Sequence, residues 1–364
     1  MRVALVHDWL TGLRGGEKVL ECLVDLYPEA TLFTLLHTPG TTLESIESLP
    51  IRTAFTQNLP LVKTHYRWYL PIFPSAIESL DLEGFDLVIS SSHCVAKGVR
   101  PPTGALHVCY CHTPMRYVWD RFEDYFGTGM TARIIYGPIA ARLRRWDVSS
   151  ASRVDHFIAN SNYVAQRIKR YYAREVDCII PPPVDTDFFT RSDVSRESYY
   201  LVVSALVPYK RIDLAIDAFR GRPERLVIVG SGPSDEKLRA RAGTNVEFRG
   251  FVPNEELREL YRRCRAVVLP GVEDFGIVPL EAQACGCPVV AFGKGGARDT
   301  VRENETGVLF DESTPSALSS AIDKVSSLSF NEESLRDWAL GFSREKFRAR
   351  IREFIRARVE RTDL

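Results

Sequence analysis

The strongest constraint on the fold is a repeated alternation of short apolar strand patterns with amphipathic helical patterns. A helix between two strands carries the chain back across the sheet, so the strands of such a chain run parallel and are covered by helices on both faces. The alternation therefore predicts an α/β protein. The expected strands lie at residues 3–7, 86–90, 106–111, 156–159, 200–206, 225–229, 246–249, 266–269, 288–292 and 307–310.

A run of three prolines at residues 181–183 marks a domain boundary, because proline continues neither a strand ladder nor a helix. A chain of 364 residues fits two domains of ~100 to 200 residues each. We expect an N-terminal domain at residues 1–183 and a C-terminal domain at residues 184–342. Apolar side chains recur at helical spacing in residues 343–364, which predicts an amphipathic helix that packs back toward the N-terminal domain.

The charge balance excludes a dedicated nucleic-acid binder, which would have a strongly basic domain. Lysine and arginine together number 47, and so do aspartate and glutamate. No stretch approaches the ~20 apolar residues that cross a bilayer, and the apolar run at residues 3–6 is too short for the core of a signal peptide. We expect a cytoplasmic protein, either free or attached to the inner face of the plasma membrane, whose eight cysteines are reduced and mostly buried.

The segment at residues 270–282 carries the most specific chemical signal. It follows an expected strand and opens a helix, so it lies at the carboxyl edge of the sheet, where open parallel sheets bind ligands. Gly276 lets the backbone approach a ligand, and the free N–H groups of Phe275, Gly276, Ile277 and Val278 form a helix N-terminus that attracts phosphate.

Two acidic residues in this segment are eight positions apart, Glu273 before the helix and Glu281 within it. A carboxylate before the helix suits the hydroxyls of a sugar, and one further along can bind a second set of hydroxyls such as those of a ribose. The alternative is a capped helix whose acids are merely solvated.

This segment resembles the Glu-x7-Glu motif of glycosyltransferase family 4, whose members are retaining enzymes of the GT-B fold. The fold implied by the resemblance consists of two Rossmann-like, doubly wound domains that face each other across a cleft. The resemblance covers nearly the whole chain. Its other matches, in chain order, are Gly12, Gly15-Gly16-Glu17, residues 158–161, Val184-Asp185, residues 207–210 and residues 230–233.

By this resemblance, Glu273 holds the hydroxyls of the donor sugar and Glu281 holds the ribose of a nucleotide sugar. Lys210 neutralises the diphosphate, and the amides of residues 275–278 contact the sugar and phosphate. A departing nucleoside diphosphate gains negative charge, which cations must meet. Because protein cations do so here, we expect neither a metal ion nor a cofactor.

The chain departs from the family pattern beside this lysine. An arginine and a leucine usually precede the lysine, whereas this chain has Ala205-Leu206. One partner of the phosphate is thus absent from its expected place. Arg211, which follows Lys210, either replaces that partner or faces solvent.

His112 ends the expected strand at 106–111, on the carboxyl edge. In the family, a histidine at this position contacts the transferred sugar, and a neutral imidazole can bond a sugar hydroxyl. The alternative is a core histidine whose bonds are all satisfied. His107, Cys109 and Cys111 lie on one face of that strand and His112 on the other, so we expect no zinc site.

Gly15 and Gly16 precede a helix after the first strand. They let that loop approach the phosphate of the donor or the acceptor, or else form a simple tight turn.

The region from Arg133 to Arg174 holds nine basic residues against two acidic ones, with apolar side chains interleaved. Such a segment is typical of attachment to an anionic membrane surface, and it is equally compatible with an ordinary solvated helix face.

We expect a metal-independent, retaining hexosyltransferase. Residues 6–11, 111–117 and 207–211 look like those of bacterial mannosyltransferases of O-antigen and exopolysaccharide synthesis. That likeness implies GDP-mannose as donor and a glycan or lipid-linked oligosaccharide as acceptor, with a UDP-sugar donor as the alternative. A nucleotide-sugar epimerase of the same fold and a non-catalytic nucleotide-sugar-binding protein are the rival functions.

Overall fold

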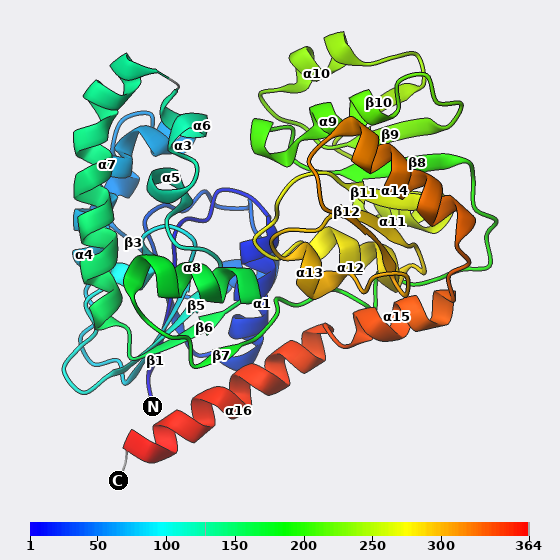
Figure 1. Ribbon diagram of the computed structural model, residues 1–364. Helices are drawn as coiled ribbons and strands as arrows, with labels where there is room; N and C mark the ends of the chain where they lie inside the picture. Colours follow the sequence, from blue (N-terminus) through cyan, green and yellow to red (C-terminus); the bar gives the residue numbers. More distant parts are fainter. Residues whose placement is uncertain (128, 363–364) are drawn as a thin grey trace. The chain divides into compact units, whose positions relative to one another are not determined.

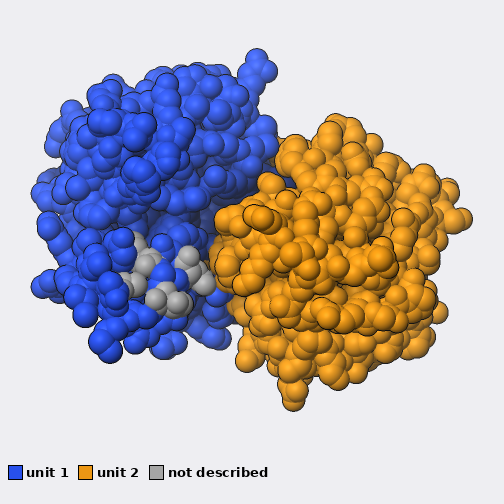
Figure 2. All heavy atoms as spheres, turned by 90° about the horizontal axis from the view of Figure 1, so that it is seen from above, with its two compact units in different colours: residues 1–183, 347–364 blue, residues 184–346 orange. Residues whose placement is uncertain are grey.

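The computed structural model describes residues 1–127 and 129–362, and it divides the chain into two compact units (Figure 1). Unit 1 comprises residues 1–183 and 347–364, and unit 2 comprises residues 184–346 (Figure 2). The division between Pro183 and Val184 falls at the end of the proline run.

Unit 1 contains a seven-stranded sheet in the order β3-β2-β1-β4-β5-β6-β7, and all its neighbouring strands are parallel. Strands β2 and β3 lie at one edge and were not predicted. The strands are β1 (Val3–His7), β2 (Thr31–Thr34), β3 (Ile51–Thr53), β4 (Leu87–Ser92), β5 (Leu106–Cys111), β6 (His156–Ala159) and β7 (Cys178–Ile179).

Helices cover both faces of this sheet, and alternate residues of each strand enter different cores. Ala4 and Val6 of β1 pack in one hydrophobic cluster, whereas Val3 and Leu5 pack in the other. This alternation follows from the two-residue period of a strand. The α-helices of unit 1 are α1 (Gly15–Leu26), α2 (Glu44–Glu47), α3 (Val62–His65), α4 (Phe73–Glu78), α5 (Arg116–Trp119), α6 (Phe122–Phe126), α7 (Met130–Ser150) and α8 (Asn162–Tyr172).

Unit 2 repeats the plan with a six-stranded parallel sheet in the order β10-β9-β8-β11-β12-β13. The two sheets confirm the predicted pair of doubly wound α/β units. The strands are β8 (Tyr199–Val203), β9 (Arg225–Val229), β10 (Val246–Gly250), β11 (Ala266–Leu269), β12 (Val289–Phe292) and β13 (Gly307–Phe310). The helices are α9 (Ile212–Ala218), α10 (Asp235–Arg241), α11 (Asn254–Arg263), α12 (Ile277–Ala284), α13 (Ala297–Thr300), α14 (Pro315–Ser327) and α15 (Glu332–Leu340).

The last helix, α16 (Arg344–Thr362), drawn in red in Figure 1, belongs to both units. Its first turn stays with unit 2, where Arg344 lies 3.7 Å from Asp185 and Ser343 forms a bridge with Val184. Unit 2 therefore extends to Lys346, beyond the expected end at residue 342. From Phe347 onward the helix packs in the core of unit 1 through Phe347, Ile351, Phe354 and Ile355.

All eight cysteines are free thiols, and seven of them are buried. Within the described part of the chain, no helix combines the length and the apolar character that crossing a membrane requires.

Candidate functional site

The loop between β11 and α12 is shaped by glycine at its end. Gly276 precedes the first residue of α12 with φ of 91°, a conformation that L side chains rarely adopt. An added Cβ there would meet neighbours at no less than 3.5 Å, so the backbone conformation rather than lack of space requires glycine. The helix thus begins at Ile277, with the amides of residues 275–278 at its N-terminus.

Glu273 is held by a second loop that sequence reasoning missed. Gly296 donates its N–H to the Glu273 carbonyl at 2.9 Å, and Gly295 forms a strand-like bridge with Glu273. A Cβ on Gly295 would lie 2.3 Å from the Glu273 carbonyl oxygen, and one on Gly296 would lie 2.2 Å from that of Phe275. Only glycine permits this approach, and the Gly-Gly pair after β12 was the available signal.

Lys210 and Glu273 form an ion pair across the carboxyl edge of the unit 2 sheet. The lysine ends a single 3-10 turn (Pro208–Lys210) after β8, and the glutamate follows β11, the neighbouring strand. Gly271 packs against the lysine backbone, where a Cβ would lie 2.7 Å from its carbonyl oxygen. The structure thus brings together two residues that the sequence placed 63 positions apart.

Glu281 is buried rather than solvated, with 4% of the residue exposed. The hydroxyl of Tyr261 on α11 donates to its Oε2 at 3.0 Å. Burial raises the pKa of Tyr261, and the nearby Glu281 carboxylate adds to that rise. With Glu273 paired to Lys210, neither acid matches the alternative of a freely solvated helix.

Arg211 follows the ion-paired Lys210, and its replacement of the missing phosphate partner stays a prediction. Its backbone is left-handed, with φ of 54°, and its guanidinium bonds Ser313 at 2.8 Å and Asp213 at 3.2 Å. The arginine is therefore held by polar groups of unit 2. Ala205, at the place where the family pattern has arginine, is exposed.

Polar side chains of unit 1 gather at the carboxyl ends of β1, β4 and β5. His112 directly follows β5, and its Nε2 lies 2.8 Å from the Ser91 hydroxyl, which also lies 3.2 Å from Nδ1 of His7. Burial lowers the pKa of His112, and the neighbouring His93 and His7 lower it further. The imidazole is therefore neutral near pH 7, the form that can bond a sugar hydroxyl.

Gly15 and Gly16 are the first two residues of α1, and not a loop before the helix as the sequence predicted, and they meet this cluster. A Cβ on Gly16 would lie 3.3 Å from His7 and 3.8 Å from Nε2 of His112. Glu17 accepts the N–H of Arg14 at 2.9 Å and lies 3.9 Å from Nε2 of His7. Burial alone would raise the pKa of Glu17, but interactions with His7, with a backbone N–H and with His93 together outweigh burial and lower it. The first turn of α1 is therefore part of the polar cluster.

Asp8 is the residue of this cluster that sequence reasoning missed. Its buried carboxylate accepts the N–H groups of four consecutive residues, His93 at 2.7 Å, Cys94 at 3.0 Å, Val95 at 2.6 Å and Ala96 at 2.8 Å. It also lies 3.1 Å from Nδ1 of His93. Asp8 thereby fixes the loop after β4, and its position just after a buried strand was the available signal.

His107, one of the residues considered for zinc, has other partners. The ring of His107 lies 2.9 Å from the Ser90 hydroxyl and 2.9 Å from the Arg153 carbonyl oxygen. Burial lowers the pKa of His107 to about 4, although the Arg153 carbonyl opposes that change. In residues 1–127 and 129–362, no group of three or more histidine, cysteine, aspartate or glutamate side chains is arranged to hold a metal ion.

The basic region from Arg133 to Arg174 divides into internal and exposed residues. Arg144, Arg153, Arg167 and Arg174 bond to groups within unit 1. Arg142, Arg145, Lys169 and Arg170 are exposed. Three apolar residues near the start of α7 are exposed as well: Met130, Ile134 and Ile135.

Two family models match the chain and together cover residues 15–339. The model described as Glycosyltransferase Family 4 matches residues 15–188, and the model described as Glycosyl transferases group 1 matches residues 185–339. The chain belongs to glycosyltransferase family 4. The two matches meet within a few residues of the boundary between the two units of this family 4 protein.

Curated relatives match the family 4 chain over part of its length. A D-inositol 3-phosphate glycosyltransferase of Acidothermus cellulolyticus is 34% identical over 49% of this chain and 47% of its own. A GDP-mannose-dependent alpha-(1-6)-phosphatidylinositol monomannoside mannosyltransferase of Mycolicibacterium smegmatis is 36% identical over 39% of this chain and 45% of its own. The chain thus spans about half the length of these relatives.

A solved structure shares the fold of the family 4 chain over nearly its whole length. Anabaena HepE, solved in complex with UDP, has a TM-score of 0.73 at 19% identity and covers 98% of this chain and 100% of its own. The same protein has also been solved with UDP-glucose. The predicted GT-B class is confirmed by this likeness.

Proposed function

We propose that the protein is a retaining glycosyltransferase that moves a hexose from a nucleotide sugar to a hydroxyl of a glycan or lipid-linked oligosaccharide. The observation that carries this proposal is the Lys210–Glu273 ion pair at the N-terminus of α12, with the buried Glu281 further along the same helix. A cation and a helix N-terminus can together bind a diphosphate. The two acids nearby can bind the hydroxyls of the sugar on each side of it.

In the proposed reaction, Lys210 and the amides at the start of α12 bind the diphosphate and stabilise the charge that it gains as the glycosidic bond breaks. Glu273 orients the hydroxyls of the hexose, and Glu281 binds the ribose. The leaving phosphate oxygen accepts the proton of the attacking hydroxyl, which adds on the face that the leaving group vacates. No protein nucleophile is needed, and because Lys210 supplies the positive charge, neither is a metal ion.

Unit 1 supplies the acceptor side in this proposal. The neutral imidazole of His112 bonds a hydroxyl of the transferred sugar, while Gly15 and Gly16 at the start of α1 let a substrate approach the cluster around Ser91. Asp8 acts through the loop after β4 and is a positioning residue.

GDP-mannose is the proposed donor, supported by the mannosyltransferase among the relatives and by the resemblance of residues 6–11, 111–117 and 207–211 to bacterial mannosyltransferases. A UDP-sugar is the second candidate, because Anabaena HepE binds UDP and UDP-glucose. The proposed place of action is the cytoplasmic face of the membrane, which the exposed arginines and apolar residues of α7 support.

The deciding experiment is calorimetry of the full chain with GDP, UDP and ADP, followed by product analysis with the matching nucleotide sugar. We expect one diphosphate to bind at least tenfold more tightly than the others. A lengthened glycan supports transfer, whereas a free epimeric nucleotide sugar would identify an epimerase. Binding without turnover on any acceptor would leave only the non-catalytic function. Activity that a chelator abolishes and Mg²⁺ restores would contradict metal independence.

A further inference from the structure

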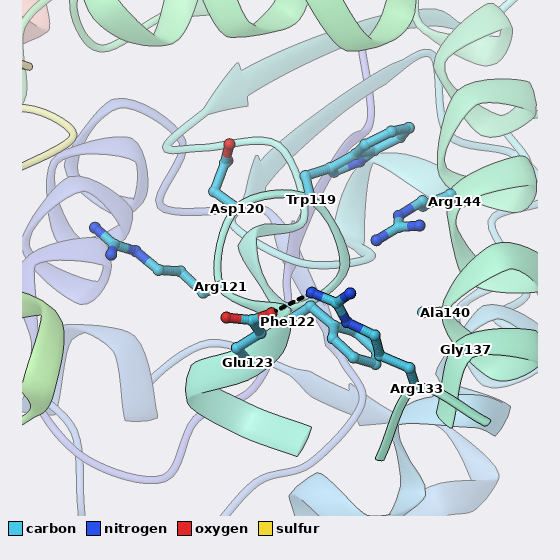
Figure 3. Close-up of a pocket in the computed structure, with 9 residues that line it drawn as sticks. All are labelled: Trp119, Asp120, Arg121, Phe122, Glu123, Arg133, Gly137, Ala140 and Arg144. Carbon is cyan, nitrogen blue, oxygen red and sulfur yellow. Dashed lines mark hydrogen bonds and ion pairs between the residues drawn. The ribbon is translucent and has the colours of Figure 1, made fainter. Parts of the chain in front are cut away.

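A cavity of about 530 Å³ lies in unit 1 and is not used in the proposed transfer (Figure 3). One wall is the chain that leaves α5 and enters α6, from Trp119 to Glu123, and the other is a face of α7. The α7 residues that line it are Arg133, Gly137, Ala140 and Arg144. Their spacing of three and four places them on one side of the helix, where the two small residues leave room between the two arginines.

Most charged groups around the cavity already have partners. Arg133 pairs with Glu123 at 2.7 Å, which is the dashed contact in Figure 3. Asp120 is bound by the buried Arg167 and by the Tyr171 hydroxyl. The two acids of the lining are therefore neutralised.

Arg144 differs from these groups. Its Nε donates to the Val118 carbonyl at 2.6 Å, and its two terminal nitrogens point into the cavity (Figure 3). Among the described residues, no carboxylate lies within ion-pair distance of this guanidinium. A half-buried arginine with two free donors is suited to bind two oxygens of one anion.

Trp119 forms a rigid wall beside Arg144. Its Nε1 donates to the buried Asp147 at 2.8 Å, and its ring stacks on Tyr171 with centroids 4.5 Å apart. The guanidinium of Arg144 lies 5.7 Å from the same ring. Because Trp119 and the Nε of Arg144 are held by other groups, the anion-binding nitrogens are fixed before any ligand arrives.

The next turns of α7 add an apolar surface. Met130 is 79% exposed and Ile134 is 69% exposed, and both lie within one turn of Arg133. Along α7, Ile134 lies about 15 Å and Met130 about 21 Å from Arg144, so the anion site and the exposed apolar side chains together are complementary to an extended amphiphile rather than to a free anion.

We propose that this cavity binds the phosphate of an amphiphilic acceptor, with the phosphate on Arg144 and the hydrocarbon chain over Met130 and Ile134. The inference rests on the proposed function in that it names the acceptor class, a lipid phosphate. The binding itself can be measured without any sugar donor.

The test is calorimetry of the full chain with three probes: decyl phosphate, decyl glucoside and inorganic phosphate. We expect decyl phosphate to bind roughly tenfold or more tightly than either of the others, because only it offers both the anion and the chain. Equal binding of decyl glucoside would overturn the role of Arg144, and equal binding of inorganic phosphate would overturn the role of the apolar residues.

Variants of α7 test separately the contact with the phosphate and the contact with the hydrocarbon chain. Arg144→Gln should lose roughly tenfold or more in affinity for decyl phosphate, while Arg145→Gln, an exposed neighbour on α7, should lose none. Arg144→Lys keeps the charge and should recover part of the loss, which guards against an effect of misfolding alone. Ile134→Ser should weaken decyl phosphate but not inorganic phosphate, with Val148→Ser at the far end of α7 as its control.

Unchanged affinity of Arg144→Gln would overturn the proposal. If GDP or UDP binds normally while decyl phosphate does not, this inference fails and the proposed function stands. If decyl phosphate binds through Arg144 but no nucleotide diphosphate binds, the proposed function fails and the anion site stands.

Discussion

The ammonium group of Lys210 pairs with the carboxylate of Glu273, and each side chain is less than one-fifth exposed, at 17% and 18%. Both groups that the proposed donor needs are thus held in place by each other. A diphosphate must attract the lysine away from the glutamate, which then becomes available to the hydroxyls of the sugar. The pair predicts separate effects for its two members.

Lys210→Met should weaken the binding of the nucleoside diphosphate, because it removes the cation that meets the phosphates. Glu273→Gln should leave that binding unchanged or tighter but lower transfer by about 100-fold or more, a loss typical of a transition-state contact. Calorimetry and a transfer assay separate the two. The surface pair Lys324–Glu303 of the same unit, 2.6 Å apart, supplies the controls Lys324→Met and Glu303→Gln. Full activity of Glu273→Gln would exclude the role of Glu273.

Tyr261→Phe should weaken nucleotide binding severalfold, because Glu281 loses the hydroxyl that orients its buried carboxylate. Tyr199 is the matched control: its hydroxyl donates at 2.9 Å to the Leu260 carbonyl, a neutral acceptor in the same core. Tyr261→Phe and Tyr199→Phe should each lower the free energy of unfolding, measured in urea, by about 1–2 kcal/mol. A diphosphate affinity that falls equally in both would show that the effect is structural.

Asp8→Asn should destabilise unit 1 by roughly 2–4 kcal/mol, because an amide replaces a carboxylate that accepts four buried N–H groups. Asp81→Asn, where the carboxylate accepts a single exposed N–H from Glu83, should change stability by less than about 0.5 kcal/mol. Urea unfolding measures both. We expect transfer to fall in Asp8→Asn even where folding is complete, since His93 and its loop lose their anchor; retained transfer would argue against a positioning role.

The low pKa of His107 predicts loss of stability in acid. Burial lowers the pKa to about 4 in the folded chain, whereas an unfolded histidine has a pKa of about 6.5. Between these values the unfolded state binds more protons, so the free energy of unfolding falls as pH decreases from about 6.5 to about 4, by up to about 3 kcal/mol in total. An NMR titration should find His107 neutral down to about pH 4. His107→Gln should flatten the pH dependence of unfolding, and titration of His107 near 6.5 would contradict the prediction.

Local sequence patterns were sufficient to predict most of the secondary structure. The strands Val3–His7, Leu106–Cys111, Arg225–Val229, Ala266–Leu269 and Gly307–Phe310 have the predicted bounds, because each is an apolar run between clear breaks. The start of α12 after Gly276 was likewise evident from the residues around it. Strand β2 was missed because it runs into a longer apolar stretch, residues 31–36, without a break at its end, and β3 was missed because it is three residues long and mostly exposed.

Neighbouring residues were enough to predict the two α/β units and the residue types at the edge of each sheet, because the periodicity of strands and helices is a local property of the chain. Which of those residues contact one another became evident from the three-dimensional structure alone. Lys210 reaches Glu273 because β8 and β11 are neighbours, Asp8 reaches the loop after β4 because β1 and β4 are neighbours, and Arg211 turns to Asp213 and Ser313. The contacts of Lys210 and Asp8 depend on the order of strands in a sheet, which no stretch of neighbouring residues encodes.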